Sequence, residues 1–130
     1  MNRFLALTAI IEVATGLALL TVPDMVVRLL LGAEISGASI PLGRVAGFAL
    51  LALGVACSQS RGDTQSGAVK GMVAAMLLYN AGVVAVLAFA SLGAGLHGVA
   101  LWPAVVLHAA LAVWCLAILR LKIPRWTGVD

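Results

Sequence analysis

The chain has 130 residues, of which 63% are hydrophobic and 10% are charged, and it carries a net charge of +3. Soluble globular domains are about 45–50% apolar and about 25% charged, and disordered chains are poorer still in apolar residues, so the composition excludes both classes. The 8 Lys and Arg residues form no basic patch interleaved with aromatic residues, which excludes a nucleic-acid partner.

Long apolar segments in the chain predict transmembrane helices, because one crossing takes about 20 apolar residues and only helices or closed barrels satisfy the backbone within lipid. The first segment covers about residues 4–22 and is followed by Pro23. It ends in Thr-Val-Pro-Asp rather than at a small-residue cleavage site. We therefore expect a retained helix and not a cleaved signal peptide.

A short apolar segment follows the first predicted helix, at about residues 25–31. Asp24 can cap this segment as a helix, and Gly32 can end it in a left-handed conformation. The segment is too short to cross a membrane. We expect an amphipathic helix that lies in the outer interface of the membrane, with a plug in the mouth of the bundle as the other interpretation.

Three further apolar segments cover about residues 40–58, 68–92 and 99–121. A polar stretch separates the first two of these, and glycines separate the last two. With the segment at 4–22 they predict four transmembrane helices in a single domain over residues 1–130. The expected fold class is therefore all-α, an integral membrane four-helix bundle with one short interfacial helix.

The basic residues are distributed unequally between the two sides of this predicted bundle. Four crossings place most of them on the side of the N-terminus, namely Arg3, Arg61, Lys70, Arg120, Lys122 and Arg125. Arg28 falls in a loop on the other side, and Arg44 lies just inside the second long helix. Basic residues gather on the cytoplasmic side of membrane proteins, so both termini are expected to be cytoplasmic.

Polar residues inside the membrane are the candidates for function, because each is costly there unless it is paired or hydrated. A rise of about 1.5 Å per residue places Glu12 about 12 Å, Tyr79 and Asn80 about 15 Å and His108 about 13 Å along their helices, near the middle of a core about 30 Å thick. Arg44 lies only about 6 Å below the outer surface. The candidate binding residues are Glu12, Arg44, Tyr79, Asn80 and His108.

Two arrangements of these residues are open. Glu12 can pair with Arg44, or it can share the middle of the membrane with His108, Asn80 and Tyr79 while Arg44 meets Asp24 or Glu34 in the outer loop. Side chains lean toward the N-terminus of their own helix, which separates Glu12 from Arg44. We therefore favour the second arrangement, either as a protonatable site for a polar or cationic solute or as a hydrogen-bonded network that holds the helices together.

Other chemistry has little support in the residues. One buried His and one Glu are too few for a zinc site, which takes three or four converging ligands, and a second axial His for haem is missing because His97 belongs to an outer loop. Cys57 and Cys115 have no metal-type spacing and are expected to be small buried residues. No catalytic motif follows a strand. We expect no cofactor, no metal and no enzymatic activity.

The chain carries resemblances to two known families. The run Ala9-Ile10-Ile11-Glu12-Val13-Ala14-Thr15-Gly16 resembles the first helix of the small multidrug resistance transporters, short four-helix proteins that act as dimers and bind drug and proton at a membrane-embedded Glu. The chain as a whole resembles small four-helix bacterial membrane proteins of the broadly DoxX-like type. Two runs support this second resemblance, Leu78-Tyr79-Asn80 and Leu101-Trp102-Pro103-Ala104-Val105-Val106-Leu107-His108. It implies the fold and a bacterial inner membrane.

The sequence therefore predicts a non-enzymatic accessory or interaction protein of the bacterial inner membrane. Its helices would pack in the lipid bilayer against a partner membrane protein or a second copy, because small residues along the helix faces favour close helix association. The alternative function is a proton-coupled transporter of a small solute, acting as a homodimer around Glu12 and His108.

Overall fold

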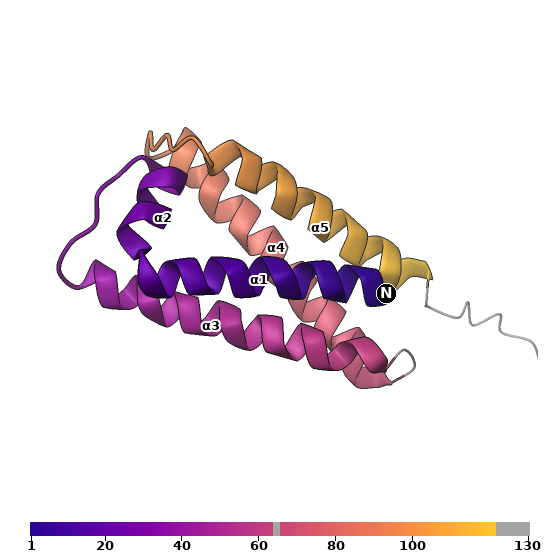
Figure 1. Ribbon diagram of the computed structural model, residues 1–130. Helices are drawn as coiled ribbons and strands as arrows, with labels where there is room; N and C mark the ends of the chain where they lie inside the picture. Colours follow the sequence, from indigo (N-terminus) through magenta and orange to yellow (C-terminus); the bar gives the residue numbers. More distant parts are fainter. Residues whose placement is uncertain (64–65, 122–130) are drawn as a thin grey trace, which may run out of the picture.

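The computed structural model describes residues 1–63 and 66–121, and the regular structure in this part of the chain is entirely helical (Figure 1). Its elements in chain order are α1 (Asn2–Thr21), α2 (Pro23–Leu31), α3 (Ser39–Gln59), the 3-10 turn η1 (Ser60–Gly62), α4 (Gly67–Leu92) and α5 (Leu101–Leu121). Four helices are long and apolar enough to cross a membrane: α1, α3 continued by η1, α4 and α5. The predicted all-α class and the four candidate spans are confirmed, and the chain is a multi-pass membrane protein.

The break between α1 and α2 follows from Pro23. A proline cannot continue a helix but fits its first residue, where no backbone N–H is needed. Val22 leaves the helical conformation at φ −135°, and its N–H still bonds to Ala18 O at 2.8 Å. Helix α2 thus begins at Pro23, and Asp24 lies in its first turn instead of capping it. The prediction of an Asp24 cap is wrong, whereas the predicted left-handed end at Gly32 is confirmed by a φ of 68°.

Helices α1 and α3 form an antiparallel pair held by contact between their backbones. A Cβ atom built on Gly16 would lie 2.8 Å from Gly47 O, and one built on Gly47 would lie 2.8 Å from Gly16 O. Near the other end of the pair, a Cβ on Gly54 would lie 3.2 Å from Ala9 O. The glycines of α3 therefore allow close packing within the chain itself, as glycines do at membrane helix interfaces.

Helices α4 and α5 form a second antiparallel pair, joined by a short turn. Ser66 caps α4 by accepting a hydrogen bond from Val69 N. In the turn, Gly95 has a φ of 67°, and Leu96 N bonds back to Ala90 O at 2.9 Å. Buried side chains join the pair at this end, from Leu87 on α4 and from Leu101 and Val105 on α5.

The two pairs meet at the end of the molecule that carries the N-terminus (Figure 1). A core of fully buried side chains from all four long helices fills this end: Phe4, Leu5, Ala9, Cys57, Val69, Val73, Met76, Leu111 and Cys115. Both cysteines are free and buried in it. Trp114 packs edge-on against Phe4, with ring centroids 5.4 Å apart.

At the other end, α2 bridges the two pairs. Ala100 N donates a hydrogen bond to Leu29 O at 2.9 Å, which ties α2 to the start of α5. Gly98 lies so close to the backbone of Leu29 and Leu30 that no side chain would fit there. The α4–α5 turn is therefore docked on α2 through main-chain atoms.

The distribution of basic residues follows the two ends of the molecule. Arg3, Arg61, Lys70 and Arg120 belong to helix ends on the N-terminal side, and Arg28 and Arg44 to the end that carries α2. Lys122 and Arg125 lie outside the described residues.

Candidate functional site

A polar cluster lies where the two helix pairs face each other, about halfway along the helices. Glu12 on α1 and Asn80 on α4 are 1% and 0% exposed, while Tyr79 on α4 and His108 on α5 are half-buried. The structure thus brings together the four residues that the rise per residue predicted to share one depth.

Asn80 orients His108. The Asn80 side chain donates from Nδ2 to Met76 O at 2.7 Å, one turn back on its own helix. Its Oδ1 is therefore the atom that faces His108 Nδ1, at 2.7 Å. An amide oxygen only accepts hydrogen bonds, so His108 Nδ1 carries the proton and donates it. In the neutral imidazole the other ring nitrogen, Nε2, is then an acceptor, and no described residue bonds to it.

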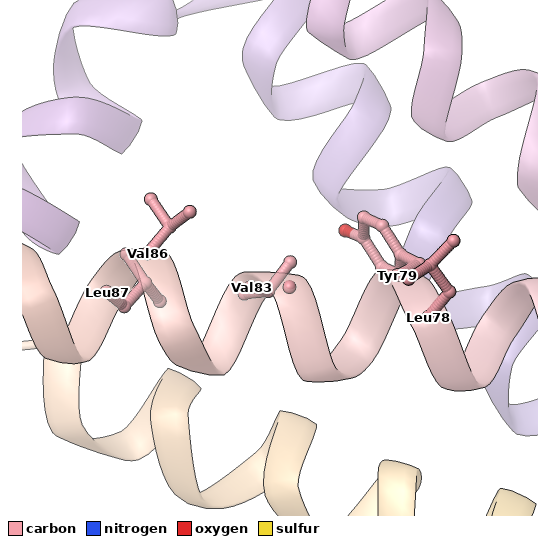
Figure 2. Close-up of a pocket in the computed structure, with 6 residues that line it drawn as sticks. Leu78, Tyr79, Val83, Val86 and Leu87 are labelled. Atoms are coloured by element: carbon pink, nitrogen blue, oxygen red, sulfur yellow. The ribbon is translucent and has the colours of Figure 1, made fainter.

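Tyr79 links Glu12 to this histidine. The rings of Tyr79 and His108 meet edge to face, with centroids 5.7 Å apart and an interplanar angle of 79°. The Tyr79 hydroxyl interacts with the Glu12 carboxyl. Figure 2 shows the Tyr79 side chain rising from α4 toward the helices of the other pair. The cluster therefore runs across the interface from α1 through α4 to α5.

Two polar atoms behind the cluster have no partner. Glu12 Oε1 and Thr8 Oγ1 are buried and make no hydrogen bond to any described residue. Thr8 lies one turn before Glu12 on the same face of α1. An unpartnered buried polar group costs about 1–3 kcal/mol of stability. The buried polar side chains of α1 are therefore less completely hydrogen-bonded than Asn80 on α4.

Arg44 does not belong to the cluster. Its side chain is exposed near the start of α3, and it forms no ion pair with any described residue. Glu34, one of the partners considered for it, is paired instead with Arg28 of α2. The structure thus has the favoured arrangement around Glu12, but neither of the partners expected for Arg44.

A cavity of about 630 Å³ lies between the two pairs, on the α2 side of the cluster. Every α-helix contributes to its wall, and α2 closes one side with Val26, Leu29 and Leu30. The polar side chains in the lining are Thr15, Tyr79 and His108, and the rest are apolar. Small-molecule sites measure roughly 300–1,000 Å³ and are mostly apolar with a few polar groups, so this cavity has the size and composition of a ligand site.

A groove of about 520 Å³ adjoins the cavity along α4 (Figure 2). It shares Tyr79, Val83 and Leu87 with the cavity wall. Its outer part is lined by Leu78 and Val86, which are 76% and 67% exposed and are apolar. The groove therefore lies on a face of the protein that the bilayer would cover, and it shares part of one wall with the cavity.

This cavity was not predicted from the sequence. Alanines contribute much of the lining: Ala14, Ala18, Ala46, Ala100 and Ala104. Alanines spaced four apart on α1 and at the start of α5 are the signal that could have indicated the cavity, since small residues facing one another leave space unless the helices approach closely.

No group of three or more metal-binding His, Cys, Asp or Glu side chains occurs among residues 1–63 and 66–121. Comparison of the chain with protein-family models, with curated proteins and with solved structures found no match. The candidate site therefore has to be interpreted from its own geometry.

Proposed function

We propose that this protein is a non-enzymatic accessory protein of the membrane that binds a small, largely apolar molecule between its two helix pairs. One observation carries the proposal: a cavity of ligand size, about 630 Å³, lies beside the polar cluster in the middle of the membrane-spanning helices, with Tyr79 and His108 in its lining. The polar groups of the cluster can orient a ligand, and the apolar wall can exclude water from it.

The chemistry of the cluster supports binding over catalysis. Within the four candidate spans that the structure describes, Glu12 is the only acidic residue, and no carboxylate belongs to the cavity lining. General acid–base chemistry with two differently placed carboxyl groups, as in glycoside hydrolysis, has no basis here. His108 is held in one orientation by Asn80, as expected of a residue that recognises a ligand.

Native mass spectrometry of the protein released from membranes in mild detergent tests this proposal. We expect the wild type to carry a co-purified apolar molecule. Ala104→Phe places a ring in the cavity and should abolish the adduct, because Ala104 is in the lining. Ala110→Phe, on the exposed side of the same helix, is the matched control and should keep it. An adduct that survives Ala104→Phe contradicts the proposal.

The second candidate function is proton-coupled transport of a small solute, by this chain as a homodimer. The observation that favours it is the contact of the buried Glu12 carboxyl with Tyr79, next to His108. Proton release on addition of amphiphilic cations to the purified protein tests it. Release that disappears in Glu12→Gln supports transport, and its absence from folded wild-type protein rejects transport.

We also propose the membrane placement: a bacterial inner membrane, cytoplasmic termini, and α2 in the outer interface. Met25 and Leu29 on α2 are exposed and apolar, and the exposed Arg28–Glu34 pair lies beside them, as suits the boundary between lipid and water. In intact cells, a membrane-impermeant thiol reagent should label Ser36→Cys but not Gly62→Cys. The reverse pattern would invert the orientation.

A partner protein or a second copy remains part of the proposal. Gly16 and Gly47 are already used within the chain, so they are not available to a partner. A groove along α1 and α3 offers small and apolar residues from both helices to a partner, among them Ala6, Ile10 and Val55, and it also contains Ser58 and Arg61. Co-purification of differently tagged copies from one cell tests self-association.

A further inference from the structure

His108 is the residue of the cavity lining that can offer a hydrogen-bond acceptor to a ligand. His108 lines the cavity, and its Nδ1 is occupied as a donor to Asn80. Nε2 is thus the ring nitrogen that is left for a ligand, and a neutral imidazole nitrogen without a proton accepts. A ligand that forms a hydrogen bond with Nε2 must carry a hydrogen-bond donor.

The lining is otherwise uncharged. Its remaining polar side chains are Thr15 and Tyr79, and the Glu12 carboxyl is 1% exposed and lies behind Tyr79 outside the lining. A charged head group would therefore be buried with no opposite charge at the wall, which is costly in apolar surroundings. A hydroxyl is uncharged, donates one hydrogen bond and accepts others. The Thr15 hydroxyl, which no described residue engages, can donate to its oxygen.

Access to the cavity also points to a molecule that is dissolved in the bilayer. The groove along α4 shares Tyr79, Val83 and Leu87 with the cavity wall and continues over exposed apolar side chains. On the α2 side, Val26, Leu29 and Leu30 cover the cavity. A ligand that enters from lipid along the groove keeps its apolar body in contact with apolar side chains throughout.

We propose that the ligand of this cavity is a lipid-soluble alcohol, an uncharged apolar molecule whose hydroxyl donates a hydrogen bond to His108 Nε2 while its body lies against α1, α2 and α5. This inference rests on the proposed function, and it names the chemical class that the site selects.

Photocrosslinking in lipid nanodiscs tests the inference with a 12-carbon alcohol that carries a diazirine. The competitors are 1-dodecanol and dodecyl methyl ether, which has the same apolar chain but no donor. We expect crosslinks on the cavity wall, including Leu29 or Leu30. One hydrogen bond contributes about 0.5–1.5 kcal/mol, so dodecanol should compete roughly three- to tenfold better than the ether.

The role of His108 is tested by His108→Phe, which keeps a ring but removes the acceptor. The preference for alcohol over ether should vanish in this variant. His97→Phe is the matched control: His97 lies in the α4–α5 turn, bonded to Ser91 at 3.4 Å and outside the cavity lining, and this variant should keep the preference. Comparing the two competitors on the wild type needs no variant, so the inference is testable even if His108→Phe fails to fold.

The possible outcomes distinguish failure of this inference from failure of the proposed function. Equal competition by alcohol and ether in the wild type overturns the alcohol class while leaving an apolar ligand site in place. Stronger competition by dodecylamine that depends on Glu12 overturns it in favour of a cation. Crosslinks that fall outside the cavity and persist in Ala104→Phe reject the proposed function itself.

Discussion

Replacing Gly16 by alanine is the sharpest test of the α1–α3 packing. The added Cβ would lie 2.8 Å from Gly47 O and 3.0 Å from Leu51 N, both main-chain atoms of α3. An ordinary contact to such atoms is at least 3.4 Å, so the helices must separate by about half an ångström along their tightest contact. Overpacking of this kind costs about 1–3 kcal/mol, partly offset by the better helix propensity of alanine, up to about 1 kcal/mol.

The matched control is Gly82→Ala on α4. Gly82 is exposed, and a Cβ there meets nothing within 4 Å, so only the propensity gain applies. We expect Gly16→Ala to lower the free energy of unfolding by about 0.5–2 kcal/mol and Gly82→Ala to leave it equal or higher. Reversible unfolding in mixed micelles of increasing SDS content measures both.

A double variant makes the test stricter. Gly16→Ala and Gly47→Ala both push the same two backbones apart, so once one has separated the helices the second meets less resistance. We expect the double variant to lose clearly less stability than the sum of the single losses, as for residues in contact. Additive losses, or a Gly16→Ala protein as stable as Gly82→Ala, would refute the contact between the two backbones.

Three further predictions concern the cluster and α2. Asn80→Leu leaves the His108 Nδ1 proton without its acceptor and should cost about 1–3 kcal/mol of unfolding free energy; an unchanged denaturation midpoint would argue against that bond. Thr8→Val, in contrast, removes a hydroxyl without a partner and should leave stability equal or raise it by up to about 1 kcal/mol; a marked loss would mean that the hydroxyl is satisfied. Gly98→Ala should force α2 off the α4–α5 turn, visible as faster hydrogen exchange across α2, whereas wild-type exchange rates would exclude close docking.

Local signals in the sequence were sufficient to predict the helices and part of the candidate site. Pro23 and Gly32 mark chain breaks through their own backbone chemistry, so the bounds of α1 and α2 could be predicted to within a few residues. The shared depth of Glu12, Asn80 and His108 follows from the constant rise of a helix. Their meeting needed only that the helices pack with polar faces inward.

The remaining features depend on contacts between distant segments. The contact of Gly98 with α2 joins main-chain atoms some seventy positions apart (98 against 29 and 30), and main-chain contacts leave no pattern of side-chain types. The expectation that Arg44 meets acidic loop residues fails at Glu34, which pairs with Arg28 because both lie at the end of the same short helix and its following loop. The cavity arises because the two pairs converge at one end only, which helical periodicity does not encode.

That one-ended convergence has a mechanical consequence. The two helices of each pair are in contact over most of their length, so a relative movement of the pairs would be a rotation with the buried core near the N-terminus as its pivot. For α1, with 20 residues and a length of about 30 Å, a rotation of about 5° at the pivot moves the far end by about 2–3 Å. The docking of Gly98 on Leu29 and Leu30, and the hydrogen bond from Ala100 N to Leu29 O, oppose such a rotation, so the width of the gap at the α2 end depends on these main-chain contacts. A change in them would alter the space close to α2 more than the space at Glu12 and His108, which lie nearer the pivot.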